Sequence, residues 1–377
     1  MSAGADGICL WDVNTGEYID EFRVPAISAA FNPDGRTCAI VREWGISIRN
    51  AQNISSEDIG SLTARDIGSV RSVAFSPDGN TIVSCSGNNI HLWDPHTKQF
   101  LKTLIGHTDL VSSVVFSPDG NTIASASDDR TIRLWNANTR EHIKTLMGHT
   151  ASVNSLVFSS DGNTIASGGN DRTIRLWNAN TGELLKTFTG HTENVNTVAF
   201  SPDGNIVASG SGRLVYHGRG EDQGTCEGQE IRLWNTNTGE HIRTLTGHTS
   251  VVNSVVFNPD GNTIASASGH WMGYESTYSN GEEVRLWNVH TGELIKTLTG
   301  HDVVVSSVVF SPDGNLIVSG TEFGEIRVWD AYTGEHLKTL KGHTGGVSSL
   351  AFSPDEKILA SSRTDGTILL WDFSNIP

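Results

Sequence analysis

The chain has 377 residues, of which 42 are acidic and 26 are basic, and its formal net charge is -16. An acidic surface repels the phosphates of nucleic acids and of anionic membranes, so the composition argues against both kinds of partner. The four cysteines contain no CxxC pair and no regular spacing, which predicts neither a zinc site nor a disulfide framework. The N-terminus lacks the basic and apolar regions of a signal peptide, and we expect a cytoplasmic protein.

A string of the form FSPDG recurs along the chain. It begins at Phe31, Phe75, Phe116, Phe158, Phe200, Phe257, Phe310 and Phe352, mostly in steps close to 42 residues. A period of about 20–50 residues is typical of stacked units that bury a core only together. Such units escape the size limit of a single core, at about 250–300 residues. We therefore expect one repeat domain that spans residues 1–377.

Each unit predicts four short strands. Between residues 152 and 188 the runs SVNSLVF, NTIASGG, TIRLWN and LLKTF are rich in β-branched and aromatic residues, and Gly, Asn and Asp separate them. No segment keeps a sustained 3.6-residue apolar period, so helices should be nearly absent. The pattern predicts an all-β chain of four-stranded sheets.

The Gly-His before the first run, the SPDG hairpin and the Trp-Asp or Trp-Asn that ends the third run resemble the WD-repeat β-propeller family. The resemblance covers essentially the whole chain, and the regular units are similar to those of bacterial WD-repeat proteins. It implies a structural hydrogen-bond network of one His, Ser, Asp and Trp in each unit. Three units hold all four residues: His107, Ser125, Asp129 and Trp135; His149, Ser167, Asp171 and Trp177; and His343, Ser361, Asp365 and Trp371. The turn Asp is missing from the other units, where Gly87, Gly228, Gly281 and Phe323 take its place.

Eight FSPDG-type hairpins predict a single closed β-propeller of eight four-stranded blades, at the upper end of the usual range of about 4–8. The last unit ends after its third strand, and we expect the N-terminal segment 17–23 to complete the last blade as its fourth strand. Residues 8–12 repeat the third-strand string of residues 368–372 and are then one strand too many. They compete with the C-terminal strand, add a fifth strand at the rim, or are left from a longer chain.

A Ser-His-Asp set also permits interpretation as a nucleophilic triad. Its repetition in structural positions favours a scaffold, because a triad needs an exposed nucleophile beside an oxyanion hole. The PDGN string lacks the alternating carboxylates of a calcium loop and predicts a hairpin turn. We expect no catalytic residue, no metal and no cofactor.

Two adjacent units depart from the period. From Phe to Trp an ordinary unit takes 19 residues, whereas the units at Phe200 and Phe257 take 34 and 30. The extra residues form loops 212–228 and 269–281, both between a second and a third strand, and such loops emerge on one face of a propeller. Aromatic residues and Arg are enriched in binding hot spots. The partner-binding candidates in these loops are Tyr216, His217, Arg219, Trp271, Tyr274 and Tyr278.

These features predict a monomeric, non-catalytic scaffold that binds a protein or peptide on the face of the two insertions. Three alternatives remain open. The insertions are tolerated loops whose aromatic residues pack on one another; the protein is an enzyme or small-ligand binder that uses the channel mouth; or the chain is a regulatory or sensor propeller cut from a larger protein. A metal site of His217, Glu221, Asp222, Cys226 and His270 is disfavoured by its mixed ligands and irregular spacing.

Overall fold

The computed structural model describes most of the chain between Val70 and Leu340, together with separate strands before and after it. The described residues are 2–4, 7–11, 18–22, 28–31, 37–42, 45–50, 61–62, 70–78, 80–94, 100–216, 224–269, 283–301, 303–321, 325–340, 347–352, 358–363 and 368–372. They belong to two compact units, one of residues 1–147 and 342–377 and the other of residues 148–341. Every element found in these residues is a β-strand, which confirms the all-β class.

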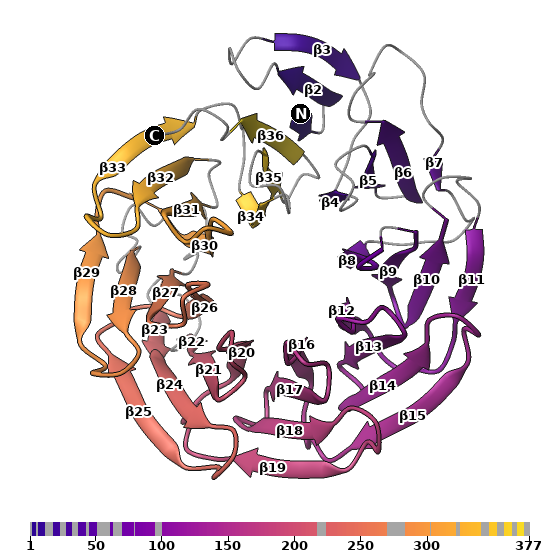
Figure 1. The fold of residues 1–377 in the computed structure, drawn as a ribbon, viewed down its shortest axis with the longest axis horizontal. Helices are drawn as coiled ribbons and strands as arrows, with labels where there is room; N and C mark the ends of the chain where they lie inside the picture. The colour runs from indigo at the N-terminus through magenta and orange to yellow at the C-terminus, as the bar shows by residue number, and fades with distance from the viewer. Residues whose placement is uncertain are drawn as a thin grey trace. The chain divides into compact units, whose positions relative to one another are not determined.

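The second unit contains four four-stranded antiparallel sheets that follow one another along the chain (Figure 1). The first strands of successive sheets, β16, β20, β26 and β30, lie next to one another. In the first sheet the predicted strands are found within one residue of their expected ends. The strands are β16 (Val153–Phe158), β17 (Thr164–Gly169), β18 (Ile174–Asn178), β19 (Leu184–Phe188), β20 (Val195–Phe200), β21 (Ile206–Ser211), β24 (Glu230–Asn235), β25 (His241–Thr246), β26 (Val252–Phe257), β27 (Thr263–Ser268), β28 (Val284–Asn288), β29 (Leu294–Leu298), β30 (Val305–Phe310), β31 (Leu316–Thr321), β32 (Ile326–Asp330) and β33 (His336–Leu340).

The first unit contains three four-stranded sheets and two three-stranded sheets among its described strands. The four-stranded sheets are β4 (Ser28–Phe31), β5 (Thr37–Arg42), β6 (Gly45–Asn50) and β7 (Ser61–Leu62); β8 (Val70–Phe75), β9 (Ile82–Ser86), β10 (Asn89–Trp93) and β11 (Phe100–Leu104); and β12 (Val111–Phe116), β13 (Thr122–Ser127), β14 (Thr131–Asn136) and β15 (His142–Met147). The three-stranded sheets are β1 (Ser2–Gly4), β2 (Gly7–Trp11) and β3 (Tyr18–Phe22), and β34 (Val347–Phe352), β35 (Ile358–Arg363) and β36 (Ile368–Asp372).

The expected completion of the last blade by residues 17–23 is not the pairing that the structure forms. Strand β3 pairs with β2, with Ile8 opposite Phe22, whereas β36 pairs with β35. Residues 13–17 repeat the short turn that joins the third and fourth strands in other sheets, and a short loop closes at a lower entropic cost than a pairing between chain ends. Strands β1 and β2 lie beside β36, so the extra third-strand copy neighbours the C-terminal one. A closed ring of eight blades stays a prediction.

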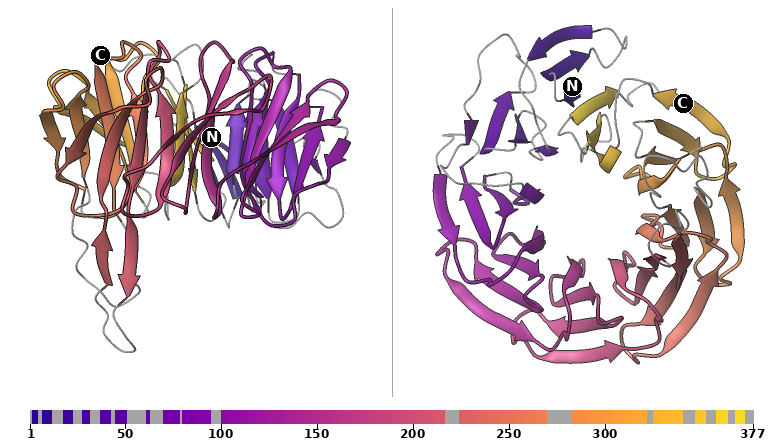
Figure 2. Two further views of the ribbon diagram at one scale, coloured as in Figure 1. Left: turned by 90° about the horizontal axis from the view of Figure 1, so that it is seen from below. Right: turned by 180° about the vertical axis from the view of Figure 1, so that it is seen from behind.

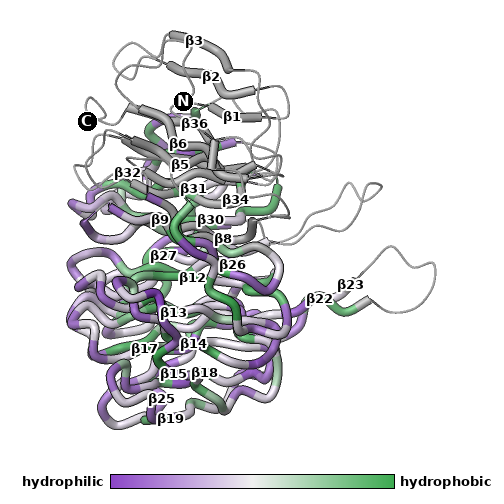
Figure 3. Tube along the Cα trace, turned by 90° about the vertical axis from the view of Figure 1, so that its right-hand side faces the viewer, coloured by the Kyte–Doolittle hydropathy of each residue, from purple (hydrophilic) through white to green (hydrophobic). Residues whose placement is uncertain are grey.

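The apolar core lies between successive sheets. In the second unit, the sheet β16–β19 and the following sheet bury one shared cluster, in which the Phe188 and Trp234 rings stack with centroids 5.2 Å apart. Hydrophobic segments lie within the strands and hydrophilic segments lie mainly at the turns, as expected when both faces of a sheet are covered (Figure 3). The cluster consists of Ala166, Ile174, Leu176 and Phe188 from the first sheet and Val195, Val198, Val207 and Trp234 from the second.

The SPDGN string forms a self-contained hairpin turn. In the second unit, Ser201 Oγ donates to Asp203 Oδ1 at 2.5 Å, and the backbone N–H of Asn205 donates to the same oxygen at 3.0 Å. The Ser201 hydroxyl in turn accepts the N–H of Ile206 at 2.9 Å. Gly204 closes the turn at a φ of 72°, which a glycine adopts at no steric cost. The Asp carboxylate therefore orders its own turn.

Arg140 occupies a backbone position that favours glycine. Its φ is 63°, in the turn between β14 and β15 where Gly182, Gly239 and Gly292 stand in other sheets. Arg140→Gly is expected to raise the free energy of unfolding by about 0.5–1 kcal/mol, because it relieves the left-handed backbone. Denaturant titration measures the change, and Gly182→Arg is the reverse control, which should lower stability. An Arg140→Gly variant less stable than the parent contradicts this account.

Candidate functional site

The first insertion forms a β-hairpin outside the four-stranded sheets. Strand β22 (Arg213–Tyr216) pairs with β23 (Gly224–Glu227), with Leu214 opposite Cys226, and the two form a sheet of their own. Two views show this hairpin extending from the end of its unit, away from the four-stranded sheets (Figures 2 and 3). In the sheet β16–β19 of the same unit, a tight turn joins the second and third strands at this place.

The base of the hairpin is held by hydrogen bonds. The hydroxyl of Ser211, the last residue of β21, donates to the Gly228 carbonyl at 2.6 Å and so joins the two ends of the insertion. The Gly212 N–H donates to the Asn194 carbonyl at 3.1 Å, and Asn196 Nδ2 donates to the Gly212 carbonyl at 3.0 Å. The hairpin therefore leaves the sheet from a fixed point.

The second insertion begins with the same arrangement. The Gly269 N–H donates to the Val251 carbonyl at 3.0 Å, and Asn253 Nδ2 donates to the Gly269 carbonyl at 2.8 Å. Asn253 also donates to the carbonyl of Val305 in the next sheet, at 3.3 Å. Equivalent contacts thus fix the starting points of two insertions in adjacent sheets.

Both insertions start at a glycine for a steric reason. Gly212 and Gly269 have φ values of 144° and 150°, and each backbone passes close to the next sheet. A Cβ atom on Gly212 would lie 3.0 Å from Val251 Cα, and one on Gly269 would lie 2.8 Å from Val304 Cα. Any other side chain at these positions would force the neighbouring backbone to move.

Most of the predicted partner-binding residues lie outside the described part of the chain. Tyr216 is placed at the end of β22, by its backbone. The other candidates, His217, Arg219, Trp271, Tyr274 and Tyr278, fall in the two stretches that the structure does not describe. The same holds for four of the five residues of the disfavoured metal set, and Cys226 Sγ lies 3.7 Å from the Ser250 hydroxyl. Within the described residues, no three or more His, Cys, Asp and Glu side chains gather as they would around a metal ion.

The structure brings the expected His, Ser, Asp and Trp together in two sheets. His107 Nδ1 lies 2.8 Å from Asp129 Oδ2, and its Nε2 lies 2.8 Å from Ser125 Oγ. The Trp135 indole N–H donates to the same hydroxyl at 2.9 Å. The second set repeats these contacts at 2.8, 2.8 and 2.9 Å, between His149 and Asp171, His149 and Ser167, and Trp177 and Ser167.

The third predicted set lies at the edge of the described residues. His343 and Asp365 fall outside them, and Ser361 and Trp371 are placed by their backbones in β35 and β36. Trp371 pairs with Leu359, two residues before Ser361. Trp135 and Ser125 have the same register, since Trp135 pairs with Ile123.

We call each hydrogen-bonded set of His, Ser, acidic residue and Trp a relay. The protonation state of the relay that contains His107 follows from its donors and acceptors. Burial lowers the pKa of His107 below its ordinary value, so the ring is neutral near pH 7. Burial alone would raise the pKa of Asp129, but hydrogen bonds from Thr131 and from the Thr108 backbone outweigh it and lower that pKa to about 2. The ionised Asp129 can only accept, which places the imidazole proton on Nδ1 and leaves Nε2 to accept the Ser125 hydroxyl proton.

This geometry rules out the triad interpretation for the described sets. Ser125 and Ser167 are completely buried, so no substrate carbonyl can reach their hydroxyl oxygens. Each oxygen also accepts the indole N–H of a buried Trp. Because a buried donor or acceptor without a partner costs about 1–3 kcal/mol, we assign the relay a structural role.

Glutamate replaces the missing turn aspartate in three sheets, a substitution that the repeat pattern did not predict. His191 Nδ1 lies 3.1 Å from Glu230 Oε1, and the corresponding distances are 3.5 Å for His248 and Glu283 and 3.4 Å for His301 and Glu325. Each Glu begins or directly precedes the third strand, where the Asp-type sheets have Thr131 and Thr173. The signal is present in the sequence as Glu-x-Arg before the repeated Trp, in EIRLW, EVRLW and EIRVW.

An arginine accompanies each of these glutamates. Arg232 Nε lies 2.7 Å from Glu230 Oε1, and the Arg232 guanidinium carbon is 6.0 Å from the centre of the Trp234 ring. Burial raises the pKa of Glu230, but hydrogen bonds from His191 and Arg232 outweigh this effect, so the net shift is downward. The carboxylate is therefore ionised and binds both neighbours.

Comparison with known proteins agrees with this geometry. The model of the WD domain, G-beta repeat, matches seven segments that together cover more than half of the chain, at residues 57–94, 98–136, 140–178, 182–217, 239–272, 292–330 and 334–372. The chain belongs to the WD-repeat family. Two of the matched segments of this WD-repeat protein end at residues 217 and 272, inside the two insertions.

Similarity to individual WD-repeat proteins is local. An uncharacterized WD repeat-containing protein of Synechocystis is 39% identical over 82 residues, 22% of this chain and 21% of the relative. Nuclear distribution protein PAC1 of Arthroderma otae is 38% identical over 90 residues, and human WD repeat and SOCS box-containing protein 1 is 32% identical over 90 residues; each alignment covers 24% of this chain and 19% of the relative. The chain thus matches about a fifth of the length of these relatives. Among the described residues, no helix has the length and apolar character needed to cross a bilayer.

The Glu-type relay can be tested with a conservative change. Glu230→Gln is expected to lower the free energy of unfolding by about 1–3 kcal/mol, because the neutral amide weakens the contacts with His191 and Arg232. Denaturant titration measures the difference. Glu240→Gln, in an exposed turn of the same sheet, is the matched control and should leave stability unchanged. Equal stability of the two variants would show that Glu230 does not belong to the relay.

Acid should destabilise the protein in two stages. Burial lowers the pKa of His107, His191 and His301, so between about pH 6.5 and their folded-state pKa values the unfolded chain binds more protons than the folded one. The contribution of these neutral histidines to the free energy of unfolding is complete above about pH 6.5 and is lost progressively below it. The Asp129 contribution, with a pKa of about 2, is lost below about pH 4. Thermal unfolding at pH 7.5, 6.0, 5.0, 4.0 and 3.0 measures both stages, and a midpoint that stays constant from pH 7.5 to 5.0 contradicts the first.

Proposed function

We propose that this WD-repeat protein is a monomeric, non-catalytic scaffold that binds a protein or peptide on the face formed by the inserted loops 212–228 and 269–281. The observation that carries the proposal is the β22–β23 hairpin, which extends from the end of its unit where the sheet β16–β19 has a tight turn (Figure 2). WD-repeat proteins are generally non-enzymatic scaffolds, which supports a binding role. The four cysteines contain no CxxC pair and no regular spacing, which fits a reducing compartment, and we place the protein in the cytoplasm.

The anchoring of the insertions supports this role. Gly212 and Gly269 are both hydrogen-bonded to their own sheets, through Asn196 and Asn253. A surface element whose ends are fixed loses less conformational freedom on binding than a free loop, so more of the contact energy is available for affinity. Loops on rigid scaffolds are also the usual place for binding residues.

The open edges of the hairpin add a second reason. Strands β22 and β23 pair only with each other among the described strands, so each has an outer edge with backbone donors and acceptors. Isolated two-stranded hairpins are marginally stable in water. A partner that packs on the hairpin would cover these edges and would meet the aromatic residues of both insertions.

Substitution of the loop aromatics tests the proposal. A variant with Tyr216, Trp271, Tyr274 and Tyr278 all replaced by Ala should lose its partner in pull-down experiments, because the hot-spot side chains are gone. Its melting temperature should stay within about 2 °C of the parent, since surface changes have small effects on stability. Mass spectrometry of the captured proteins identifies the partner as the species lost in the variant and in a chain without residues 213–227.

Tyr332→Ala is the matched control for this experiment. Tyr332 is a highly exposed aromatic residue at the other end of its sheet, in the turn after β32. Its replacement should leave capture unchanged. Capture that survives in the four-alanine variant would overturn the proposal, as would a partner lost equally in Tyr332→Ala.

A further inference from the structure

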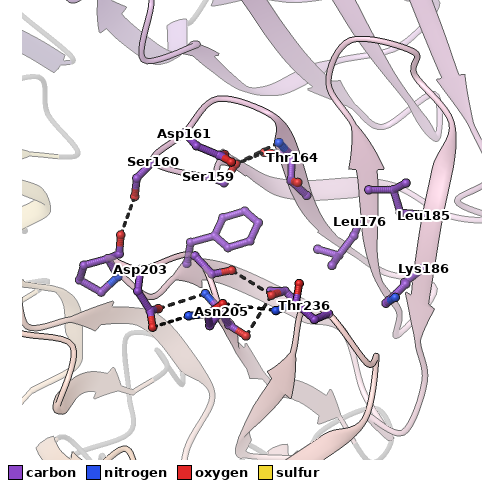
Figure 4. A pocket seen from close by; sticks show the side chains of 14 residues that line it. Ser159, Ser160, Asp161, Thr164, Leu176, Leu185, Lys186, Asp203, Asn205 and Thr236 are labelled. Carbon is purple, nitrogen blue, oxygen red and sulfur yellow. Dashed lines mark hydrogen bonds between the residues drawn. The ribbon is translucent and has the colours of Figure 1, made fainter.

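A pocket of about 550 Å³ lies between the first two sheets of the second unit. Its walls come from the turns that join first to second and third to fourth strands and from the adjacent ends of strands β17, β18, β19 and β20, at the opposite end of the sheets from the hairpin (Figure 4). Asp161 and Asp203 stand on one side of the pocket, and Lys186, Leu185 and Leu176 stand on the other. The pocket thus has an acidic side and a basic, apolar side.

The two carboxylates on the acidic side are ionised and have room for one more donor each. The hydrogen bond from Ser159, followed by those from Asn163, lowers the pKa of Asp161. Among the described residues, Asp161 Oδ1 accepts two of these internal bonds, whereas Oδ2 accepts one, from Asn163 Nδ2 at 2.9 Å. The Asp203 turn has the same arrangement, and within the described part of the chain Asn205 Nδ2 is the one donor to Oδ2, at 2.7 Å. Each Oδ2 therefore has a lone pair for a ligand.

The ammonium on the other side lacks a partner that its counterparts have. In the next two sheets the equivalent cations, Arg243 and Lys296, donate across the gap to the carbonyls of His290 and Thr333. Lys186 Nζ has no hydrogen-bond or ion-pair partner among the described residues, although the side chain is half-buried. It is free to bind an anionic group that enters the pocket.

The pocket is held open by its own rim. Ser160 stands where most of the other repeats have a proline, and its hydroxyl donates to the Pro202 carbonyl of the next sheet at 3.0 Å. Asn237 Nδ2 donates to Asn205 Oδ1 at 3.3 Å and joins two further turns of the lining. These bonds preorganise the pocket, so a ligand does not have to order its walls.

We infer that this pocket binds a peptide segment that carries one basic and one acidic side chain. The basic group lies between Asp161 and Asp203, the acidic group pairs with Lys186, and the aliphatic stem of the basic side chain packs on Leu176 and Leu185. A volume of about 550 Å³ is in the range of small-ligand pockets, at about 300–1,000 Å³, and holds two side chains and the backbone between them. Opposite charges on two sides of the pocket select a peptide with both signs over one that is only basic or only acidic.

Fluorescence anisotropy with synthetic peptides tests the inference. The probes are fluorescein-labelled, acetylated and amidated peptides with one Arg and one Glu separated by zero to three alanines, and matched peptides in which Arg or Glu is replaced by Gln. The Arg–Glu peptide of at least one spacing should bind the parent chain, and the two matched Gln peptides should bind it more weakly. Asp203→Asn and Lys186→Met should each weaken the Arg–Glu peptide by about three- to fivefold, the size expected for partly exposed charge pairs.

Each substitution should affect only those peptides that carry the charge bound by the substituted residue. Asp203→Asn should have no effect on the peptide without Arg, and Lys186→Met should have no effect on the peptide without Glu. Asp260→Asn and Lys338→Met change equivalent positions that do not line the pocket, and they should bind the peptides like the parent. Binding that is unaffected by Asp203→Asn and Lys186→Met would overturn the inference, as would the absence of binding at every spacing. The chain without residues 213–227 should keep this binding, which separates the pocket from the insertion face.

Discussion

The burial of one sheet against the next is the constraint on which the described structure depends. Trp234 belongs to the third strand of its own sheet, yet it packs in a cluster with residues of the preceding sheet. A four-stranded sheet alone would expose that apolar face to water. The matched WD segments reflect the same constraint, since residues 98–136 run from the fourth strand of one sheet, β11, to the third strand of the next, β14. Each sequence repeat therefore contributes to two sheets.

This constraint directs variation to the ends of the sheets. A residue inside a strand contacts the next sheet, whereas the described part of the turn between β21 and β24 contacts it at its base, where Gly212 lies against Val251 and Cys226 lies beside Ser250. Gly212 and Asn196 make contacts of this kind, and the residues that follow Gly212 do not need to match the repeat sequence. The same reasoning applies to Lys186, which needs no partner at the next sheet because the shared core already holds the two sheets together.

The regular parts of the fold were predictable because the same pattern of strand and turn residues occurs in several units, and each copy supports the same assignment. Alternating apolar residues and turn motifs predicted the strands of β16–β19 to within one residue. The relay residues His107, Ser125, Asp129 and Trp135 were found by their fixed spacing. Glu230 was missed because the carboxylate moves from the turn to the start of the strand, so the spacing changes although the contact with the His is kept.

Two other features were beyond prediction for physical reasons. The N-terminal pairing was wrong because Tyr18–Phe22 suits two partners, and only the cost of loop closure favours the adjacent β2. The pocket between Asp161 and Lys186 was not predicted at all. It depends on how closely side chains of two different sheets approach one another, and the sequence periodicity contains no information on the distances between them.

The move of the carboxylate from turn to strand has a consequence for how this protein can change. A turn that contains Asp129 cannot lengthen without withdrawing the acceptor from His107. Once Glu230 or Glu283 supplies the acceptor from the strand, the turn no longer has a structural duty, and both long insertions occur in sheets of this kind. Glu325 places the sheet β30–β33 in the same class while its turn is still short. The connection between β31 and β32 is therefore a position at which a further loop can be inserted, by evolution or by design, in the sheet that follows the two sheets with insertions.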